Sequence, residues 1–249
     1  MFSKRSQKLE RIDTGDYTPE EYEQFLKDIA YINRRLGDNA ALEKTLLAEI
    51  ERLDLKEFSV LDVGAGSGEL LRFIAEFANR MGRQATLVGI DLNRQAIDSM
   101  RKGSAEFDSI FPVRGDALDL PFDPDSFDYC ISSLFTHHLK DDQIVALFKE
   151  MDRVSRRGII SIDLHRHPMA WILYKLFCWS HGISPMVRYD GSLSILRSFR
   201  GNELQKLASR ANLSNAFVES HSPHRLVLHT MPKMADVLDP RQESDFSLL

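Results

Sequence analysis

Short apolar segments alternate with amphipathic segments between residues 58 and 230. A short apolar segment is typical of a buried strand, and apolar residues spaced three or four apart are typical of a helix. Their alternation predicts strand, helix, strand units and therefore a parallel sheet. We predict strands at Ser59–Val63, Thr86–Ile90, Ile110–Val113, Phe127–Ser132 and Gly158–Ile162, and helices at Glu69–Arg80, Arg94–Lys102, Asp141–Val154 and Gly201–Ala211.

Two further strand-like segments follow the last of these helices. Asn215–Ser220 and Arg225–Thr230 are separated by a short stretch around Pro223, which predicts an antiparallel pair. With the five earlier strands, this pair completes a seven-stranded sheet. The predicted fold class is therefore α/β, with a doubly wound, mostly parallel sheet and an antiparallel terminal hairpin.

The segment before the first strand is rich in charge and shows helical periodicity. Thr18 followed by Pro19 is typical of a helix N-terminus, and apolar residues recur at helical spacing after them. A second amphipathic helix is predicted from about Ala40 to Leu53. We expect the two helices to form a cap in front of the core domain.

The alternation fails between residues 164 and 199. This segment is long for a connection and rich in aromatic residues, which is typical of a lid or a binding element. Within it, Met169–Trp179 is apolar except for Lys175 and is too short to span a bilayer. A core helix, a wall of an apolar acceptor pocket and an interfacial helix in transient contact with a membrane are the three interpretations. The pocket wall is favoured, which implies a lipophilic or aromatic acceptor.

The pattern thus divides the chain into three parts. Residues 1–57 are predicted to be a helical cap, and residues 58–230 a ligand-binding domain that includes the insertion at 164–199. Residues 231–249 are predicted to be a C-terminal tail that frays from Pro240 onward.

Charge and cysteine content narrow the class of protein. The formal net charge is −5, so the chain has no overall positive field that would favour nucleic acid as a partner. Cys130 and Cys178 stand in apolar stretches without another Cys or His at ligand spacing, which argues against a disulfide and a metal site. The N-terminus lacks an apolar run that could serve in a signal sequence, and no stretch of about 18 apolar residues exists that could span a membrane. We therefore expect a cytoplasmic protein that holds no metal.

The most informative segment joins the first predicted strand to the first core helix. Gly64, Gly66 and Gly68 stand there at alternate positions. Glycine at the first position permits a tight turn, and at the second it lets a ligand approach the backbone where a Cβ would interfere. The third glycine opens a helix whose first amides can bind an anion. This arrangement predicts a nucleotide-like ligand at the end of the strand.

The spacing of the glycines excludes two common nucleotide sites. A dinucleotide fingerprint needs its third glycine one residue later, where Glu69 stands. A phosphate-binding P-loop needs a Gly-Lys-Ser or Gly-Lys-Thr sequence, which does not follow here. Asp62, just before the turn, would repel a pyrophosphate but can accept hydrogen bonds from an ammonium group. The expected ligand is therefore cationic or zwitterionic.

This segment resembles the first motif of the class I methyltransferases that use S-adenosylmethionine (SAM), of the small-molecule type related to quinone biosynthesis. The resemblance extends through later motifs from about Phe58 to Thr230. It implies the Rossmann-like fold of that family, SAM as cofactor, S-adenosylhomocysteine as product and a small-molecule acceptor. The cofactor contacts that it implies come from Asp62, Gly64, Ala65, Gly66, Gly68, Asp91, Leu92, Asp116, Ala117 and Ser132.

The resemblance also assigns roles to these positions. It implies that Asp91 holds the ribose hydroxyls, that Leu92 packs on the adenine, and that Asp116 and the amide of Ala117 bind the adenine edge. Residues 132–135 read Ser-Ser-Leu-Phe, whereas enzymes that methylate amide or nucleobase nitrogen carry Asn-Pro-Pro and an aromatic residue there. Oxygen or ring carbon is therefore favoured as the methyl acceptor.

Histidines provide the candidate bases. Ligands gather at the carboxyl ends of the strands in an open α/β sheet. Two histidine pairs follow predicted strands there, His137 with His138 and His165 with His167. Histidine titrates near neutrality and can accept a proton from a hydroxyl group. The pattern ranks neither pair above the other, and packing, capping or exposure explains each histidine equally well.

The leading hypothesis is a SAM-dependent methyltransferase that transfers a methyl group to a small, aromatic or lipophilic acceptor, at oxygen. The near alternative is a C-methyltransferase of a quinone-like or polyketide-like substrate. A SAM-binding domain without catalytic activity is a third hypothesis. A nicotinamide-dependent oxidoreductase is disfavoured by the early third glycine.

Overall fold

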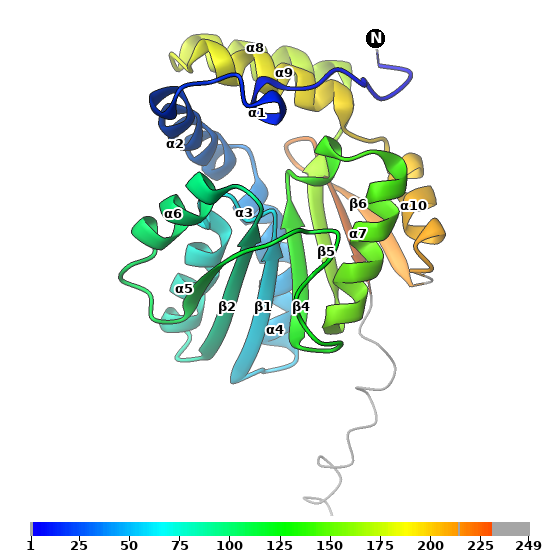
Figure 1. The fold of residues 1–249 in the computed structure, drawn as a ribbon. Helices are drawn as coiled ribbons and strands as arrows, with labels where there is room; N and C mark the ends of the chain where they lie inside the picture. The colour runs from blue at the N-terminus through cyan, green and yellow to red at the C-terminus, as the bar shows by residue number, and fades with distance from the viewer. Residues whose placement is uncertain (1, 214, 231–249) are drawn as a thin grey trace, which may run out of the picture.

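The computed structural model describes residues 2–213 and 215–230, and the predicted tail at 231–249 lies outside the described residues (Figure 1). The strands form one sheet in the order β3-β2-β1-β4-β5-β7-β6. The pairs among β1 to β5 are parallel, and β7 is antiparallel to both β5 and β6. The predicted seven-stranded sheet with its antiparallel hairpin is confirmed. The strands are β1 (Glu57–Val63), β2 (Gln84–Asp91), β3 (Ile110–Arg114), β4 (Phe127–Ser133), β5 (Ser155–Leu164), β6 (Ala216–His221) and β7 (Arg225–Thr230).

The helices of the core agree with the predicted ones to within one residue at each end. They are α5 (Glu69–Arg80), α6 (Arg94–Gly103), α7 (Asp141–Val154) and α10 (Gly201–Arg210). The N-terminal part holds α1 (Arg11–Thr14), α2 (Pro19–Arg35), α3 (Asp38–Leu42), the π-helical turn η1 (Glu43–Leu47) and α4 (Ala48–Arg52). A 3₁₀ turn, η2 (Thr136–His138), follows β4, and the insertion forms α8 (Pro168–Ser180) and α9 (Pro185–Arg197).

Strand β5 begins three residues before its predicted start at Gly158. Ser155 pairs with Phe127 of β4, and the Nε of Arg157 donates to a carboxylate oxygen of Asp128 at 3.2 Å. A strand that begins with Ser-Arg-Arg carries no apolar signal, so its start depends on these contacts with the neighbouring strand.

Helices cover both faces of the sheet, as the alternation of side chains along a strand requires. Val60 of β1 packs in one core with α5, α6 and the η1 turn, whereas Leu61 packs in the opposite core with α7 and α10. Both side chains are fully buried. The first core includes Leu42, Leu46, Leu71 and Ile74, and the second includes Ile90, Phe148, Leu204 and Leu207.

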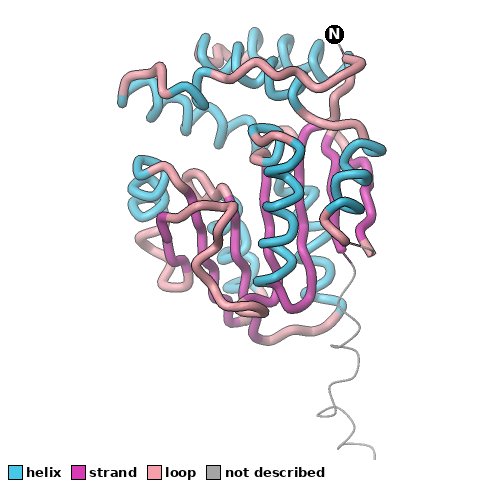
Figure 2. Tube along the Cα trace, turned by 45° about the vertical axis from the view of Figure 1, so that its right-hand side comes forward, coloured by secondary structure: helices cyan, strands magenta, loops and turns pink. Residues whose placement is uncertain are grey.

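The expected N-terminal cap is divided between two places. Helix α2 begins at the predicted Thr18 cap, whose hydroxyl accepts from the amide of Glu21 at 3.2 Å. The predicted helix from Ala40 to Leu53 is instead a broken series, α3, η1 and α4, whose apolar side chains belong to the core of the sheet. This second part therefore covers the sheet, whereas α2 lies beyond its edge (Figures 1 and 2).

A separate layer lies over the carboxyl edge of the sheet. It consists of α1, α2, α8 and α9, at the top of Figure 1. Ile32 of α2, Tyr174 of α8 and Val187 of α9 are buried in a third apolar cluster that joins these helices. Among the described residues, no helix has both the length and the apolar character needed to cross a membrane.

A buried ion pair fastens the N-terminal part to the last strand. The Nε of Arg225 on β7 lies 2.6 Å from Oδ1 of Asp38, the first residue of α3, and both side chains are less than 5% exposed. Removal of one member leaves a buried charge that has lost its counterion. We expect Asp38→Ala to lower the free energy of unfolding by about 3–5 kcal/mol in urea denaturation.

The double variant Asp38→Leu/Arg225→Met tests the cause of that loss. It removes both charges and fills the space with apolar atoms, so it should recover most of the lost stability. A double variant as unstable as Asp38→Ala would show that the pair is not the source of the effect.

Candidate active site

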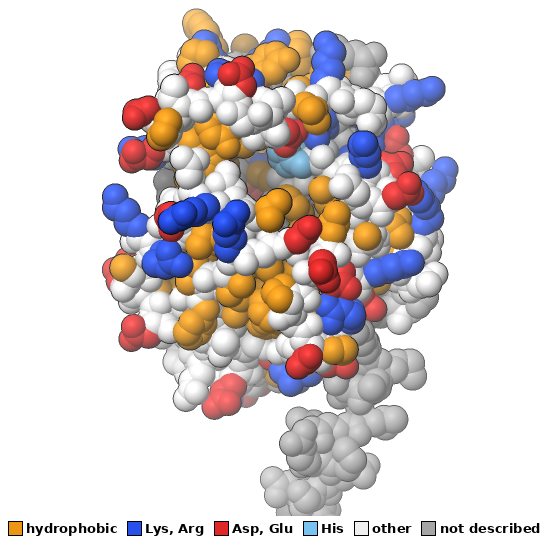
Figure 3. All heavy atoms as spheres, viewed as in Figure 1, with side chains coloured by type: hydrophobic (Ala, Val, Ile, Leu, Met, Phe, Trp, Pro, Cys, Tyr) orange, Lys and Arg blue, Asp and Glu red, His pale blue; other side chains and the backbone are white. Residues whose placement is uncertain are grey.

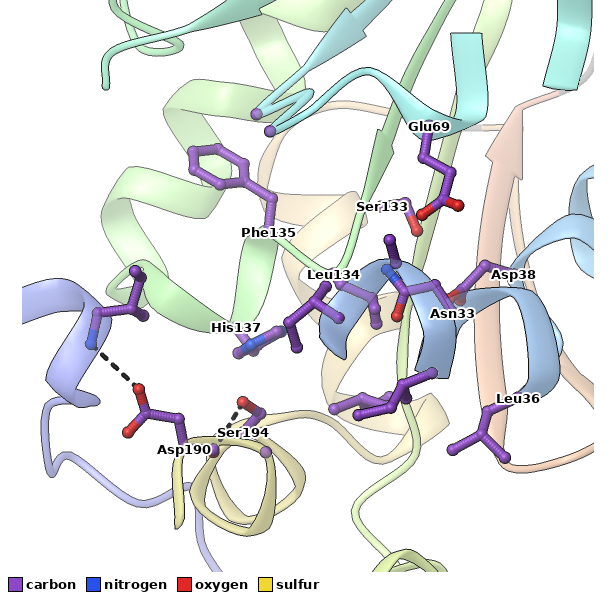
Figure 4. Close-up of a pocket in the computed structure, with 18 of the residues that line it drawn as sticks. Asn33, Leu36, Asp38, Glu69, Ser133, Leu134, Phe135, His137, Asp190 and Ser194 are labelled. Carbon is purple, nitrogen blue, oxygen red and sulfur yellow. Dashed lines mark hydrogen bonds between the residues drawn. The ribbon is translucent and has the colours of Figure 1, made fainter. Parts of the chain in front are cut away.

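A cavity of about 630 Å³ lies between the carboxyl edge of the sheet and the helical layer above it. Its lower side is formed by the loops after β1, β2 and β4, and its upper side by α2, α8 and α9. Figure 4 shows Glu69, Ser133 and Phe135 on the side of the sheet, Asp190 and Ser194 of α9 opposite them, and His137 between the two sides. The cavity therefore lies where an open α/β sheet binds its ligands.

The glycine-rich turn forms one end of the cavity. Gly64 has a φ of +73°, and a Cβ at this position would lie 2.5 Å from the ring of Phe135, so no side chain fits there. Gly66 has a φ of +53° and open space in the direction of its missing Cβ. Gly64, Ala65 and Gly66 all line the cavity. The turn thus presents bare backbone to a ligand, as the sequence predicted.

Two carboxylates stand beside this turn. Asp91 ends β2 and accepts hydrogen bonds from the amides of Gly66 at 3.0 Å and Asn93 at 2.8 Å. Asp62 of β1 is 2% exposed, and its buried Oδ1 has no hydrogen-bond partner among the described residues. Burial, aided by the charge of Asp91, raises the pKa of Asp62 to about 7. A buried carboxylate oxygen without a donor is costly, so this position favours a ligand that brings a donor or a positive charge.

The other residues predicted to contact a cofactor lie outside the lining of the cavity. Gly68 precedes α5 and faces Met100, and Ser132 is buried with its hydroxyl donating to the Val63 carbonyl at 2.9 Å. Leu92 and Asp116 are exposed at the surface, and Ala117 is half-buried against the α7 side of the core. Contact of these five residues with a cofactor stays a prediction.

His137 lies between the sheet side and the α9 side of the cavity and is 3% exposed. Its Nδ1 lies 2.8 Å from Oδ1 of Asp163, a fully buried residue of β5. Oδ2 of the same carboxylate accepts from the His137 amide at 3.0 Å and from the Thr136 hydroxyl. Asp163 thus fixes the ring with Nδ1–H as donor and leaves Nε2 free to accept a proton.

Asp163 is held in its ionised form. Burial opposes ionisation of this carboxyl group. The charge of His137 and the hydrogen bonds from His137, Thr136 and the Leu164 amide outweigh burial, and they lower the pKa of Asp163 to about 2. A charged carboxylate at Nδ1 stabilises the imidazolium that forms when Nε2 takes a proton. The pair has the arrangement of a general base and the group that orients it.

His138 points to a second carboxylate, from the N-terminal segment. Its Nδ1 lies 2.6 Å from Oδ1 of Asp13, and its ring centre is 4.3 Å from that of His137. Glu10, which is 2% exposed, places Oε1 at 3.8 Å from Nε2 of His137, and burial raises the pKa of Glu10 to about 7. The N-terminal segment therefore closes the histidine side of the cavity with two acidic groups.

Glu10, His137 and His138 have potential metal-ligand atoms within 4.8 Å of one another. The guanidinium of Arg197, however, lies 3.6 Å from Oε1 of Glu10 and would repel a cation at that point. The prediction that the protein holds no metal stays a prediction.

The second histidine pair lies away from the cavity lining. His167 is exposed and caps α8, its Nδ1 accepting from the Met169 amide at 3.1 Å. The ring of His165 is 5.7 Å from that of His167, and burial with nearby positive charge lowers the pKa of His165. His224, which stacks on His167, is the member of this group that reaches the cavity. Of the four candidate bases, His137 and His138 line the cavity.

Helices α8 and α2 contribute apolar side chains to the cavity. Helix α8 contributes Ala170, Leu173, Tyr174 and Phe177, and α2 contributes Phe25, Leu26 and Ile29. The insertion therefore supplies a wall of the cavity, as favoured from the sequence. The contribution of α2 was not predicted, because a helix that precedes the sheet by 20 or more residues gives no signal of where it docks.

Two polar residues of the site were also missed by the sequence analysis. Asp163 is the last but one residue of β5, as Asp62 is of β1, and Asp91 ends β2. Each follows an aliphatic residue, so a search for acidic residues near strand ends would have found Asp163. Glu10 stands in a charged segment without periodicity. Its position depends on contacts with α9, where Ser194 donates to its Oε2 at 2.8 Å.

Comparison with known sequences identifies the region that contains this turn. Residues 60–158 match the sequence model of a family described as a methyltransferase domain. A demethylmenaquinone methyltransferase from Staphylococcus aureus (strain MRSA252) is 31% identical over 103 residues, which are 41% of this chain and 41% of that protein. The match thus spans less than half the length of the curated relative.

Comparison with solved structures covers most of the chain. A SAM-dependent methyltransferase from Aquifex aeolicus superimposes with a TM-score of 0.60 at 14% identity, over 86% of this chain and 98% of that one. A magnesium protoporphyrin IX methyltransferase from Synechocystis PCC 6803, with bound S-adenosylhomocysteine, gives 0.55 at 14% identity over 79% and 84% of the two chains. Residues 60–158 are therefore similar to a methyltransferase domain, and the chain shares its fold with solved SAM-dependent methyltransferases.

Proposed function

We propose that this protein transfers the methyl group of SAM to a hydroxyl oxygen of a small, aromatic and lipophilic acceptor. One observation carries the proposal: a single cavity is lined both by an unpaired buried carboxylate beside a glycine turn and by an aspartate-oriented histidine. The first arrangement suits a cationic cofactor. The second suits removal of a proton from the acceptor.

The residues of the glycine turn fit SAM. Oδ1 of Asp62 lacks a donor that the ammonium group of the cofactor would supply, and Gly66 leaves open space beside the backbone. Asp91, already oriented by two amides, would accept from the ribose hydroxyls. Bound SAM supplies an electrophilic methyl group on a positively charged sulfur, which leaves as a neutral thioether.

His137 acts as the base in this proposal. Its Nε2 would take the proton of the acceptor hydroxyl as the oxygen receives the methyl group that SAM would supply. The positive charge lost by the cofactor is thus balanced by the imidazolium, which Asp163 stabilises through Nδ1–H. Positioning supplies much of the rate and the base a smaller part.

The walls of the cavity favour a lipophilic acceptor. Phe25, Ile29 and Phe177 face the space between α2 and α8, so an acceptor ring or chain there would displace water from apolar side chains. The polar groups on this side are concentrated around His137, where Glu10 and Ser194 also lie. An acceptor with one polar edge and an apolar body fits this distribution.

A second candidate function is methylation of a ring carbon. The demethylmenaquinone methyltransferase among the relatives favours it, because a quinone-like acceptor also has a polar edge and an apolar body. The same base would serve, since removal of a hydroxyl proton raises electron density on the ring. The two candidates differ in the atom that bonds to the methyl carbon.

The direct test is calorimetry with SAM, followed by incubation with methyl-labelled SAM and a panel of hydroxylated aromatic compounds. We expect SAM binding and a product whose labelled methyl group has the NMR chemical shift of a methoxy group. A labelled methyl on a ring carbon would replace the leading candidate by the second. Absence of SAM binding would overturn both.

Asp62→Asn tests the cofactor end of the cavity. The amide removes the negative charge, so SAM should bind about 10- to 100-fold more weakly by calorimetry at pH 8. In the wild type, SAM affinity should rise with pH and level off above about 7, because Asp62 ionises there. In the variant this rise should be absent or reduced.

The same substitution should stabilise the protein in the absence of ligand. The pKa of Asp62 is raised from its ordinary 3.8 to about 7, so the folded state holds this proton more tightly than the unfolded state. The protein therefore loses stability as the pH rises from the ordinary pKa of 3.8 to about 7, and this group causes no further loss at higher pH. Above pH 7, thermal unfolding of Asp62→Asn should therefore occur at a higher temperature than that of the wild type. Equal melting temperatures across this range would contradict the assignment.

His137→Gln tests the base. We expect kcat to fall by about 10²- to 10⁴-fold while SAM affinity changes little, because the variant keeps the cavity but loses the proton acceptor. His167→Gln is the matched control, since that histidine caps α8 outside the cavity, and its kcat should stay near that of the wild type. A larger loss in the control than in His137→Gln would reject His137 as the base.

Asp163→Asn tests the positioning role. The amide cannot stabilise the imidazolium, so the maximum of kcat should fall and the acidic limb of the pH profile of kcat should move to lower pH. A purely structural role would lower the fraction of active enzyme without moving this limb.

A further inference from the structure

Helix α8 has an outer face that is apolar and uncovered. Ile172 is 46% exposed, Leu176 56% and Trp179 78%, and Met169 and Leu173 are each nearly half exposed. At 100° per residue these five side chains lie on one side of the helix, opposite the buried Ala170, Tyr174 and Cys178. In Figure 3 hydrophobic side chains are visible along the top edge of the molecule, where α8 lies in Figure 1. A contiguous apolar face of this kind on the surface indicates an interaction site.

Positive charge borders this face. Between Pro168 and Arg197 the exposed charged residues are Lys175 and Arg188, and both are cations. They line a groove of about 800 Å³ between α8 and α9, together with Lys8 of the N-terminal segment. The ammonium of Lys175 lies 3.7 Å from the ring centre of Trp171 at the same groove. The acidic residue of this stretch, Asp190, is buried and accepts from two amides of α1.

The charge distribution distinguishes between two occupants of this face. In a symmetric dimer of this chain, the same surface of each copy would meet, and Lys175 and Arg188 of one copy would approach those of the other. An anionic bilayer instead offers an apolar interior to the aliphatic side chains and phosphate groups to the cations. A tryptophan at the end of the apolar face is also typical of the level of the lipid headgroups.

We propose that the outer face of α8, with the cationic groove beside it, docks this protein on a bilayer that contains anionic lipids. Ile172, Leu176 and Trp179 enter the boundary between headgroups and acyl chains, and Lys175 and Arg188 contact phosphate groups. The helix lies in the plane of the surface.

The inner face of the same helix gives the docking a consequence for the reaction. Ala170, Tyr174 and Phe177 line the cavity, and Leu173 lines it while remaining 47% exposed. A lipophilic acceptor dissolved in the bilayer would therefore meet one wall of the cavity at the docked surface. This consequence rests on the proposed function, whereas the docking itself does not.

The test measures binding of the full chain to vesicles in the absence of SAM and acceptor. Sedimentation with vesicles of phosphatidylcholine and phosphatidylglycerol should bring down the protein, and vesicles of phosphatidylcholine alone should bind it less. In a Trp171→Phe variant, the emission of Trp179 should shift to shorter wavelength on binding. The triple variant Ile172→Ser/Leu176→Ser/Trp179→Ser should bind anionic vesicles at least about tenfold more weakly than the wild type.

Two control variants, one for the apolar side chains and one for the cations, separate the apolar and electrostatic contributions to vesicle binding. Phe111→Ser/Phe217→Ser removes side chains of similar exposure, 49% and 47%, from β3 and β6, and should leave vesicle binding unchanged. Lys175→Glu/Arg188→Glu should abolish the preference for anionic vesicles, whereas Lys149→Glu/Lys206→Glu, which changes exposed lysines of α7 and α10, should keep most of it. Thermal unfolding checks that each variant is folded.

Three results would overturn the proposal. They are absence of binding to anionic vesicles, binding that the folded triple variant retains in full, and a dimer in analytical ultracentrifugation that the triple variant abolishes. Because SAM is absent throughout, failure of vesicle binding leaves the proposed methyl transfer untouched. Failure of SAM binding likewise leaves the vesicle result standing.

Discussion

Burial of negative charge at the carboxyl edge of the sheet is the constraint on which the rest of the site depends. Asp62, Asp91 and Asp163 stand at or near the ends of β1, β2 and β5, where parallel strands bring them to one edge. A buried carboxylate needs donors or a counterion. Asp163 receives four donors, from Thr136, His137 and the Leu164 amide, Asp91 receives two backbone amides, and Oδ1 of Asp62 is left without a donor among the described residues. These differences give His137 and the glycine turn different electrostatic surroundings within one cavity.

The helical layer is tied to the η2 turn, which carries His137, by a second set of charges. Arg197 of α9 donates to the backbone carbonyls of His137 at 3.2 Å and His138 at 2.7 Å, and it also pairs with Asp13. Arg5 contacts the same turn through the carbonyl of Leu139 at 3.1 Å. Because these side chains come from the insertion and from the N-terminal segment, the orientation of η2 depends on both. A change in either segment is therefore expected to move His137 without contacting the glycine turn.

The sequence predicted the parts of the structure that local patterns determine. The strands, the glycine turn and the terminal hairpin follow from periodicity and from backbone geometry that only glycine adopts easily. Local patterns could not show which of the four histidines is the candidate base. That choice depends on which ring contacts Asp163 of the neighbouring strand and which ring caps a helix. The break of the second N-terminal helix at η1 was equally hidden, since Glu43–Leu47 has ordinary helical residues and its π turn forms where Leu46 and Leu47 pack on the core.

Helix α8 shows why one pattern permitted several interpretations. A helix that is apolar on all sides is usually buried on all sides, whereas a helix at a surface usually has a polar face. In α8 the inner side chains line the cavity and pack on α2, and the outer ones are exposed above it. The segment has no amphipathic period because its inner side chains meet the cavity and α2, and its exposed outer side chains are apolar as well. The pocket wall and the interfacial helix, which were alternatives for the sequence, are compatible as two faces of one helix.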